Sequence, residues 1–169
     1  MNIYMLSGHC ENGAFHALMD ICFEYSDYFT LGFDDNSFCS SNHYSLEAEL
    51  APYLLCTQKV DLWYCYTPAF NVLHVFKAIP ETQKIIDKYC NSIYFDEIDN
   101  QCGRQQFKYC DLCFFREDQL FLGTISHEHM AYIYSPFEDI WIDLLNAGHW
   151  IEPYYLAPPQ LRLSNFIRP

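Results

Sequence analysis

The sequence predicts an α+β domain in which about three or four helices pack on a largely antiparallel sheet. Two observations favour this class. The chain of 169 residues is 51% hydrophobic and 18% aromatic, which is enough apolar surface for one folded core and excludes an intrinsically disordered chain. Strand-like runs follow one another through the second half with few helices between them, whereas a doubly wound βαβ sheet needs a helix after each parallel strand.

Four segments have helical patterns. The strongest is 135–147, where Ser135 and Glu138 fit a capping box, Pro136 suits the first helical position and Gly148 supplies a left-handed stop. Its apolar residues recur at helical spacing and form one face. The other helices are expected at 80–90, at about 13–24, and from Ser45 until Pro52 interrupts the pattern.

Several short runs are rich in β-branched and aromatic residues and are separated by turn residues, which is typical of strands. Runs 110–117 and 120–125 meet at Asp118 and Gln119, and this spacing predicts a hairpin. The other expected strands are 27–33, 60–66, 72–78, 92–97 and 129–134.

No Gly/Ser linker and no internal repeat divides the chain. We therefore expect a single domain over residues 1–169, with 153–169 as an extended C-terminal segment laid on it. The first residues carry no Lys or Arg and no long apolar run follows, so we expect neither a signal peptide nor a membrane span. The nine cysteines are odd in number and irregular in spacing, which is typical of reduced thiols in a cytoplasmic protein.

Charge is the main functional signal. The chain has 22 acids against nine Lys and Arg, for a net charge of −13. We do not expect direct binding to nucleic acid or to anionic membranes, because both are negative themselves. The charge is unevenly spread, since residues 1–58 contain eight acids and no Lys or Arg. Clustered carboxylates favour docking of one basic protein partner.

The acids fall into four groups along the chain. Three of these groups supply the candidate partner contacts, and the fourth, Glu117–Asp118, borders the predicted hairpin turn. The alternative for every group is a solvated surface that keeps the protein in solution. The residues that we expect to bind the partner are Asp34, Asp35, Glu47, Glu49, Asp96, Glu97 and Asp99.

Two thiols and two imidazoles offer an alternative site. Cys110, Cys113, His127 and His129 have the ligand types of a tetrahedral zinc site, and would suit a small metal- or thiol-dependent hydrolase. In a regular strand, however, residues i and i+3 point to opposite faces, so the two thiols would not converge. The His pair lacks the spacing of the helical zincin motif, and no phosphate-binding loop or nucleophile elbow is present. We therefore predict no catalytic residue, no metal and no cofactor.

The stretch LFLGTISHEHMAYIY (120–134), followed by a helix ending in LLNAGHW (144–150), resembles the C-terminal half of small acidic immunity proteins. These proteins belong to bacterial polymorphic toxin and contact-dependent growth inhibition systems. The resemblance implies an acidic protein without enzymatic activity that binds and neutralises one cognate toxin domain, often a basic nuclease.

Three other functions stay open. A phage-type inhibitor or nucleic-acid mimic would use the same charge against a different target, and the neighbouring gene would distinguish it. The hydrolase would contain stoichiometric zinc when purified without added metal. A structural or adaptor subunit would co-purify with a larger complex.

Overall fold

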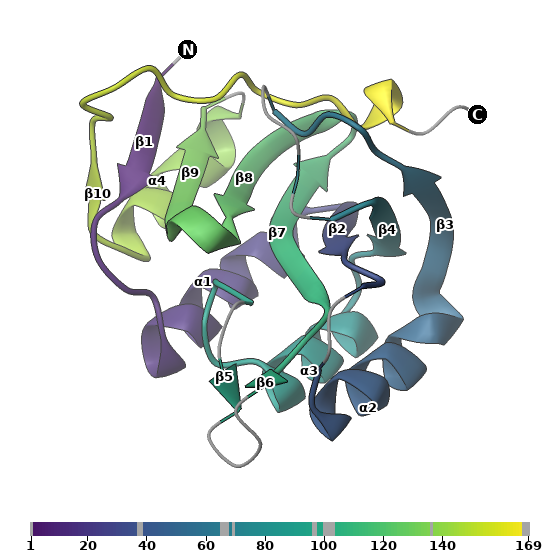
Figure 1. The fold of residues 1–169 in the computed structure, drawn as a ribbon. Coiled ribbons are helices and arrows are strands. Elements are labelled where there is room, and N and C mark those ends of the chain that lie inside the picture. Colours follow the sequence, from purple (N-terminus) through teal and green to yellow (C-terminus); the bar gives the residue numbers. More distant parts are fainter. Residues whose placement is uncertain are drawn as a thin grey trace.

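The computed structural model describes residues 2–36, 39–64, 68, 70–95, 98–99, 104–135 and 137–166. Its centre is an eight-stranded sheet in the order β10-β1-β9-β8-β7-β2-β4-β3, in which every neighbouring pair is antiparallel (Figure 1). Two short strands pair separately, β5 (Ile98–Asp99) with β6 (Arg104–Gln105). The strands of the main sheet are β1 (Ile3–Leu6), β2 (Tyr28–Phe33), β3 (Leu54–Lys59), β4 (Val72–Lys77), β7 (Tyr109–Arg116), β8 (Gln119–Ile125), β9 (Met130–Tyr134) and β10 (Trp150–Ile151).

Four α-helices in the described part of the chain cover one face of this sheet. Buried residues of all four belong to one apolar core with Phe29, Phe76 and Phe114 of the central strands. Together the antiparallel sheet and the helices confirm the predicted α+β class. The helices are α1 (Asn12–Tyr25), α2 (Ser41–Leu50), α3 (Pro80–Tyr89) and α4 (Glu138–Asn146), and the short 3-10 turns are η1 (Ala51–Tyr53), η2 (Ser126–Glu128) and η3 (Leu163–Asn165).

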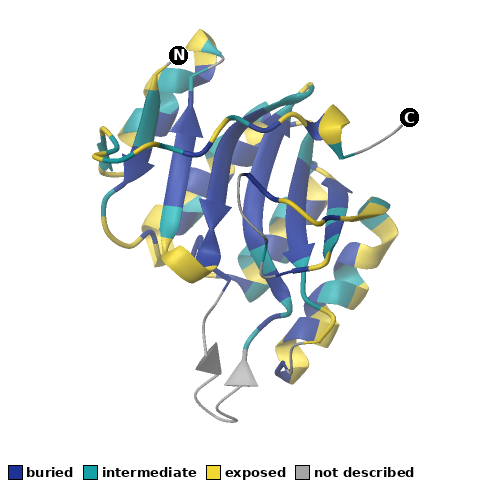
Figure 2. Ribbon diagram, turned by 45° about the horizontal axis from the view of Figure 1, so that its top comes forward, coloured by how far each residue is buried: buried dark blue, intermediate teal, exposed yellow. Residues whose placement is uncertain are grey.

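The opposite face of the sheet is covered by irregular chain. Trp63 from the connection between β3 and β4 is fully buried there, with ring centroids 5.6 Å from Phe70 and 5.0 Å from Phe166. The segment after β10 crosses this face, and both sides of the central strands are buried (Figure 2). The backbone N–H of Leu120 in β8 donates to the carbonyl of Leu161 at 3.2 Å. The second core is therefore closed by coil rather than by helices.

Two predicted strands, 60–66 and 92–97, are wrong, because the apolar residues described in them pack on other parts of the protein instead of forming strands of the sheet. Residues 60–64 of the predicted strand 60–66 form no strand, and the aromatic side chains of Trp63 and Tyr64 pack on the sheet, whereas 65–66 lie outside the described residues. Residues 92–95 of the predicted strand 92–97 form only an isolated bridge from Ser92 to Glu11, and 96–97 are not described. A short apolar run has the same pattern whether it pairs in a sheet or packs on one. Conversely β3 was missed, because most of its residues are exposed.

The ends of α4 also differ from the prediction. The helix begins at Glu138 with Phe137 as its N-cap residue, and no side chain caps it. The hydroxyl of Ser135 instead accepts a hydrogen bond from the backbone N–H of Asn2 at 3.0 Å, and Pro136 lies outside the described residues. The capping box is therefore wrong, because Ser135 is used to hold the N-terminal strand.

Helix α4 ends before Gly148, as predicted, but not through the left-handed backbone expected of this residue. Gly148 follows α4 but does not have a left-handed backbone. Its lack of a side chain is needed for packing instead, because a Cβ atom there would lie 2.9 Å from Nε1 of Trp150. The other helices lie near their predicted ranges, except that α2 begins at Ser41, four residues before Ser45. None of the helices in the described part combines the length and the apolar character of a membrane span.

Candidate functional site

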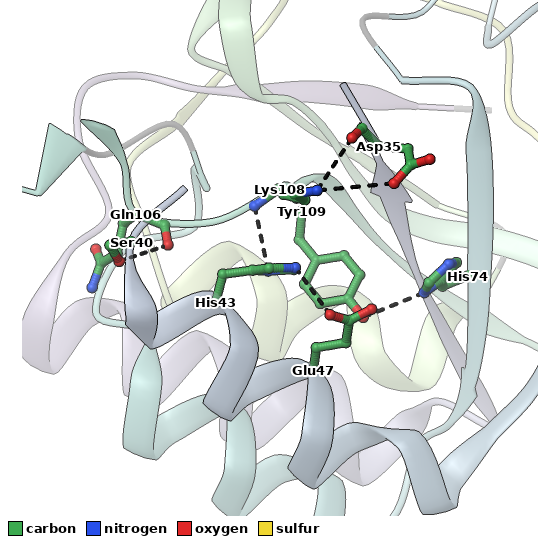
Figure 3. A network of polar contacts seen from close by, with 8 residues as sticks. All are labelled: Asp35, Ser40, His43, Glu47, His74, Gln106, Lys108 and Tyr109. Atoms are coloured by element: carbon green, nitrogen blue, oxygen red, sulfur yellow. Dashed lines mark hydrogen bonds and ion pairs between the residues drawn. The ribbon is translucent and has the colours of Figure 1, made fainter. Parts of the chain in front are cut away.

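The described acid candidates lie around α2 and the end of β2. Asp34 and Asp35 follow β2 directly, and Glu47 and Glu49 lie on α2. Figure 3 shows Asp35 and Glu47 on either side of a polar network that joins α2 to the sheet. Asp96 and Glu97 fall outside the described residues, and Asp99 is described only as backbone of β5.

His43 is at the centre of this network. Its side chain is fully buried, and its Nδ1 accepts a hydrogen bond from the backbone N–H of Lys108 at 3.4 Å. The neutral ring therefore carries its proton on Nε2, which lies 3.3 Å from Oε2 of Glu47 without hydrogen-bond geometry. Burial, and then the positive charges of Lys108 and His74, lower the pKa of His43 to about 4. His43 is neutral near pH 7, and a buried ring with Nδ1 occupied is poorly placed to act on a substrate.

A second histidine extends the network into the sheet. Nδ1 of His74 lies 3.3 Å from the hydroxyl of Tyr109, and the His74 ring stacks on Phe33 with centroids 4.7 Å apart. Burial lowers the pKa of His74 and, together with the charge of Glu47, raises the pKa of Tyr109. Both groups are therefore uncharged near pH 7. The centroid of the His43 ring lies 5.8 Å from that of Phe33 and 5.2 Å from that of Tyr109, so these rings fasten α2 to β2, β4 and β7.

The acids at this end are engaged within the protein. Nζ of Lys108 donates to the backbone carbonyl of Asp35 at 3.2 Å and lies 3.9 Å from its carboxylate. Glu49 accepts hydrogen bonds from Lys88 at 2.5 Å and from the hydroxyl of Tyr89 at 2.6 Å, and these bonds lower its pKa. Because cations offset these carboxylates, they attract a partner less than their sequence pattern suggests. Contact with a partner here stays a prediction.

The Cys and His residues of the alternative site are arranged differently from the expectation. A bulge at Asp111, which has φ 51°, places two residues of β7 between those that face Thr30 and Gly32 of β2. Cys110 and Cys113 consequently point to the same face, and the expectation of opposite faces is wrong because the bulge resets the alternation. Burial raises the pKa of both thiols, that of Cys113 to about 12, so neither is an activated thiolate.

The two histidines do not join these thiols. His127 lies in η2, and His129 follows it and stacks on Tyr94 with centroids 5.2 Å apart. In the described ranges no three His, Cys, Asp or Glu side chains are grouped so that they could hold a metal ion. The four residues of the alternative site, all of them described, therefore do not form a zinc site.

A different group of acids comes together at the opposite end of the sheet, where α1 ends, β2 begins, β7 turns into β8 and α4 begins. Oδ2 of Asp27 accepts the backbone N–H of Glu117 at 2.6 Å, and the pairing of β2 with β7 fixes this contact. We call this surface the acidic end. Its members are Glu24, Asp27, Glu117, Asp118, Glu138, Asp139 and Asp143.

Two arginines pair with members of the acidic end. Arg116 contacts Asp139 at 2.5 Å and Arg162 lies 3.6 Å from Asp118. The first pairing lowers the pKa of the Asp139 carboxyl. Lys77 follows on the neighbouring strand, in register with Tyr28. Seven acids and these three bases leave a net charge of −4 on ten residues.

The negative charge of the acidic end also acts on the hydroxyl of Tyr25. It donates to Asp143 at 3.0 Å, and this bond, burial, and the charges of Asp143, Glu24 and Asp139 raise its pKa. Carboxylates from α1 and α4 therefore act on one point although they are far apart in sequence.

An apolar groove of about 490 Å³ adjoins the acidic end on the coil-covered side of the sheet. Tyr28, Leu55, Cys56 and Leu163 supply apolar lining, and Glu117 and Asp118 border it. Leu55 is 52% exposed, because the β3 register skips it between Leu54 and Cys56.

Sequence reasoning missed this surface for a topological reason. In the sequence, Glu117 and Asp118 border the predicted hairpin, and Glu24 and Asp27 lie in the base-free first third. These acids are joined only because β2 pairs with β7. A residue-by-residue pattern carries no signal for that pairing.

Comparison with known proteins found no matching family model, no matching curated protein and no matching solved structure.

Proposed function

We propose that this protein is an acidic inhibitor that binds and neutralises one basic protein, as an immunity protein does with a nuclease-type toxin domain. The acidic end is the observation that carries the proposal. Spread evenly over 8595 Å² of surface, a charge of −13 would place only about one net charge on a partner footprint of ~800 Å². The acidic end gathers −4 on ten residues, so the charge is concentrated enough to orient a partner.

Charge complementarity explains how such a surface would inhibit. Proteins that act on nucleic acid have basic surfaces around the site that holds phosphates. Carboxylates presented by a rigid scaffold occupy the same positions and speed association through long-range attraction. The acids here are held by two helices, a strand pair and a hairpin, so little ordering is required when a partner binds.

The test is a native pull-down with mass spectrometry at about 50 mM and about 500 mM salt, a range over which exposed charges become largely screened. We expect one basic partner at low salt and less of it at high salt. E24Q/E117Q/E138Q removes three exposed charges from the acidic end and should weaken binding of the purified partner. E11Q/D61N/E128Q removes the same charge at the opposite end of the sheet, just before α1, after β3 and in η2, and should not weaken binding.

Recovery of no basic partner at either salt concentration contradicts the proposal, and so does equal weakening by both variants. The identity of a recovered partner separates an immunity protein, which binds a toxin domain, from a phage-type inhibitor, which binds a host protein. Both variants should fold normally, because every substituted carboxylate is exposed.

A further inference from the structure

The groove beside the acidic end combines two kinds of surface in one place. Its lining is mainly apolar, with side chains from β2, β3, β4 and η3. Its border carries Glu117, which is exposed, and Asp118. The Asp118 carboxylate accepts the backbone N–H of Ser164 at 2.6 Å and its hydroxyl at 2.9 Å, and it lies 3.6 Å from Arg162, so Glu117 supplies the negative charge of the border that is not offset by these groups. An apolar groove with a negative border fits an apolar side chain that has cations next to it.

The edge of the sheet keeps this groove accessible. β3 is the last strand of the sheet, and Leu55 stands out from it at a bulge. Edge strands commonly carry bulges that disturb pairing with another strand. Although it is exposed, Leu55 lines the groove. A side chain entering the groove would therefore meet Leu55 on the strand side and Leu163 on the other.

We propose that this groove receives one apolar side chain of the basic partner, while Lys or Arg residues next to that side chain contact Glu117. This inference rests on the proposed function. Buried apolar anchors commonly dominate binding energy, whereas charges at the border set association rate and partner choice. A second copy of this chain is disfavoured as the occupant, because two acidic ends would repel each other.

The thiol of Cys56 allows occupancy of the groove to be measured. It lines the groove and is partly exposed, whereas Cys10, Cys22, Cys39, Cys90 and Cys113 are buried. An occupied groove should shield the Cys56 thiol from a neutral alkylating reagent such as iodoacetamide. Peptide mapping by mass spectrometry identifies the alkylated cysteine, so the other thiols do not confuse the result.

The probes are three synthetic peptides, RKLKR, RKSKR and EELEE. We expect RKLKR at ~1 mM to halve the alkylation rate of Cys56, as for a contact with a dissociation constant of ~1 mM. RKSKR lacks the anchor and EELEE lacks the cations, so both should protect less. L55S should remove the protection by RKLKR. L62S is the matched control, because Leu62 is 57% exposed on the coil away from the groove lining.

Each other outcome overturns the inference. Equal protection by RKSKR means that charge alone binds the peptide, and equal protection by EELEE means that the groove takes apolar ligands without regard to charge. Absence of protection by any peptide means that the groove is not a docking point. In these cases the inhibitor function still stands if E24Q/E117Q/E138Q loses the basic partner. If RKLKR protects Cys56 but no basic partner exists, the groove stands and the inhibitor function fails.

Discussion

The hydroxyl of Tyr64 occupies the space in which a Cβ atom of residue 123 would lie, directly over Gly123 of β8. Tyr64 has a left-handed backbone with φ 56°, and its hydroxyl is 3.7 Å from Sγ of Cys113 on the adjacent strand β7. The connection between β3 and β4 therefore docks on the sheet through a side chain that only a glycine admits. This contact closes the coil-covered core at its centre.

Gly123→Ala should destabilise the protein by about 1–3 kcal/mol, because the added methyl group overpacks a buried site. Urea unfolding measures the change. Gly13→Ala is the control: no atom lies within 4 Å of its added Cβ, and alanine favours the first turn of α1. In a Tyr64→Phe background the cost of Gly123→Ala should fall, because the hydroxyl that clashes is gone. An unchanged cost there would mean that Tyr64 does not cause it.

The bulge in β7 is held by a reciprocal pair of hydrogen bonds. The backbone N–H of Asp111 donates to the hydroxyl of Ser126 at 2.8 Å, and the N–H of Ser126 donates to Oδ1 of Asp111 at 2.7 Å. Both residues are buried. Asp111→Ala should cost about 2–3 kcal/mol, since it leaves a buried N–H unpaired and places alanine at φ > 0. Asp111→Asn keeps an acceptor and tolerates this backbone, so it should cost clearly less. Thermal unfolding of both variants distinguishes the two effects.

His43 predicts a loss of stability in acid. Its pKa is about 4 in the folded protein and 6.5 ordinarily, so between these values the unfolded chain binds a proton that the folded chain does not. The contribution of neutral His43 to the free energy of unfolding is complete above pH 6.5 and is lost as the pH falls toward 4. The full loss is about 3 kcal/mol, because each unit of difference in pKa between the folded and unfolded states is worth ~1.36 kcal/mol.

Urea unfolding at pH 7.5, 6 and 5 tests this dependence. His43→Asn keeps an acceptor for the Lys108 N–H but does not titrate, so its stability should change less with pH. Part of the slope should persist, because burial lowers the pKa of His74 in the same sense. His9→Asn is the control at an exposed histidine. Equal slopes for His43→Asn and the unaltered protein would show that His43 titrates normally.

The sequence predicted the parts of this structure that depend on local pattern. The helix at 80–90, the strands at 72–78 and 120–125, and the α+β class follow from periodicity and turn residues, and the structure confirms them. What was missed depends on pairing between distant segments. The bulge at Asp111 and the use of Trp63 as a cover for the sheet follow from contacts with β2, η2 and the C-terminal segment. The same holds for the acidic end, which exists because β2 pairs with β7.

A surface kept negative for a partner should cost stability in the free protein. The acidic end places seven carboxylates near three bases, and like charges at short range repel. E24Q/E117Q/E138Q should therefore raise Tm at about 10 mM salt by ~1–2 °C, since each removed repulsion is worth a few tenths of a kcal/mol. At about 500 mM salt the gain should vanish, because the Debye length falls below the spacing of exposed charges.

Calorimetry at the two salt concentrations measures this gain, with E11Q/D61N/E128Q as the variant of equal charge. The control should gain less at low salt, because its acids lie on separate elements at the other end of the sheet and do not surround one point. A gain of equal size in both variants would indicate repulsion from the total charge of −13 rather than from the acidic end. A loss of stability in E24Q/E117Q/E138Q would mean that these carboxylates stabilise the fold, and their concentration would then need no partner to explain it.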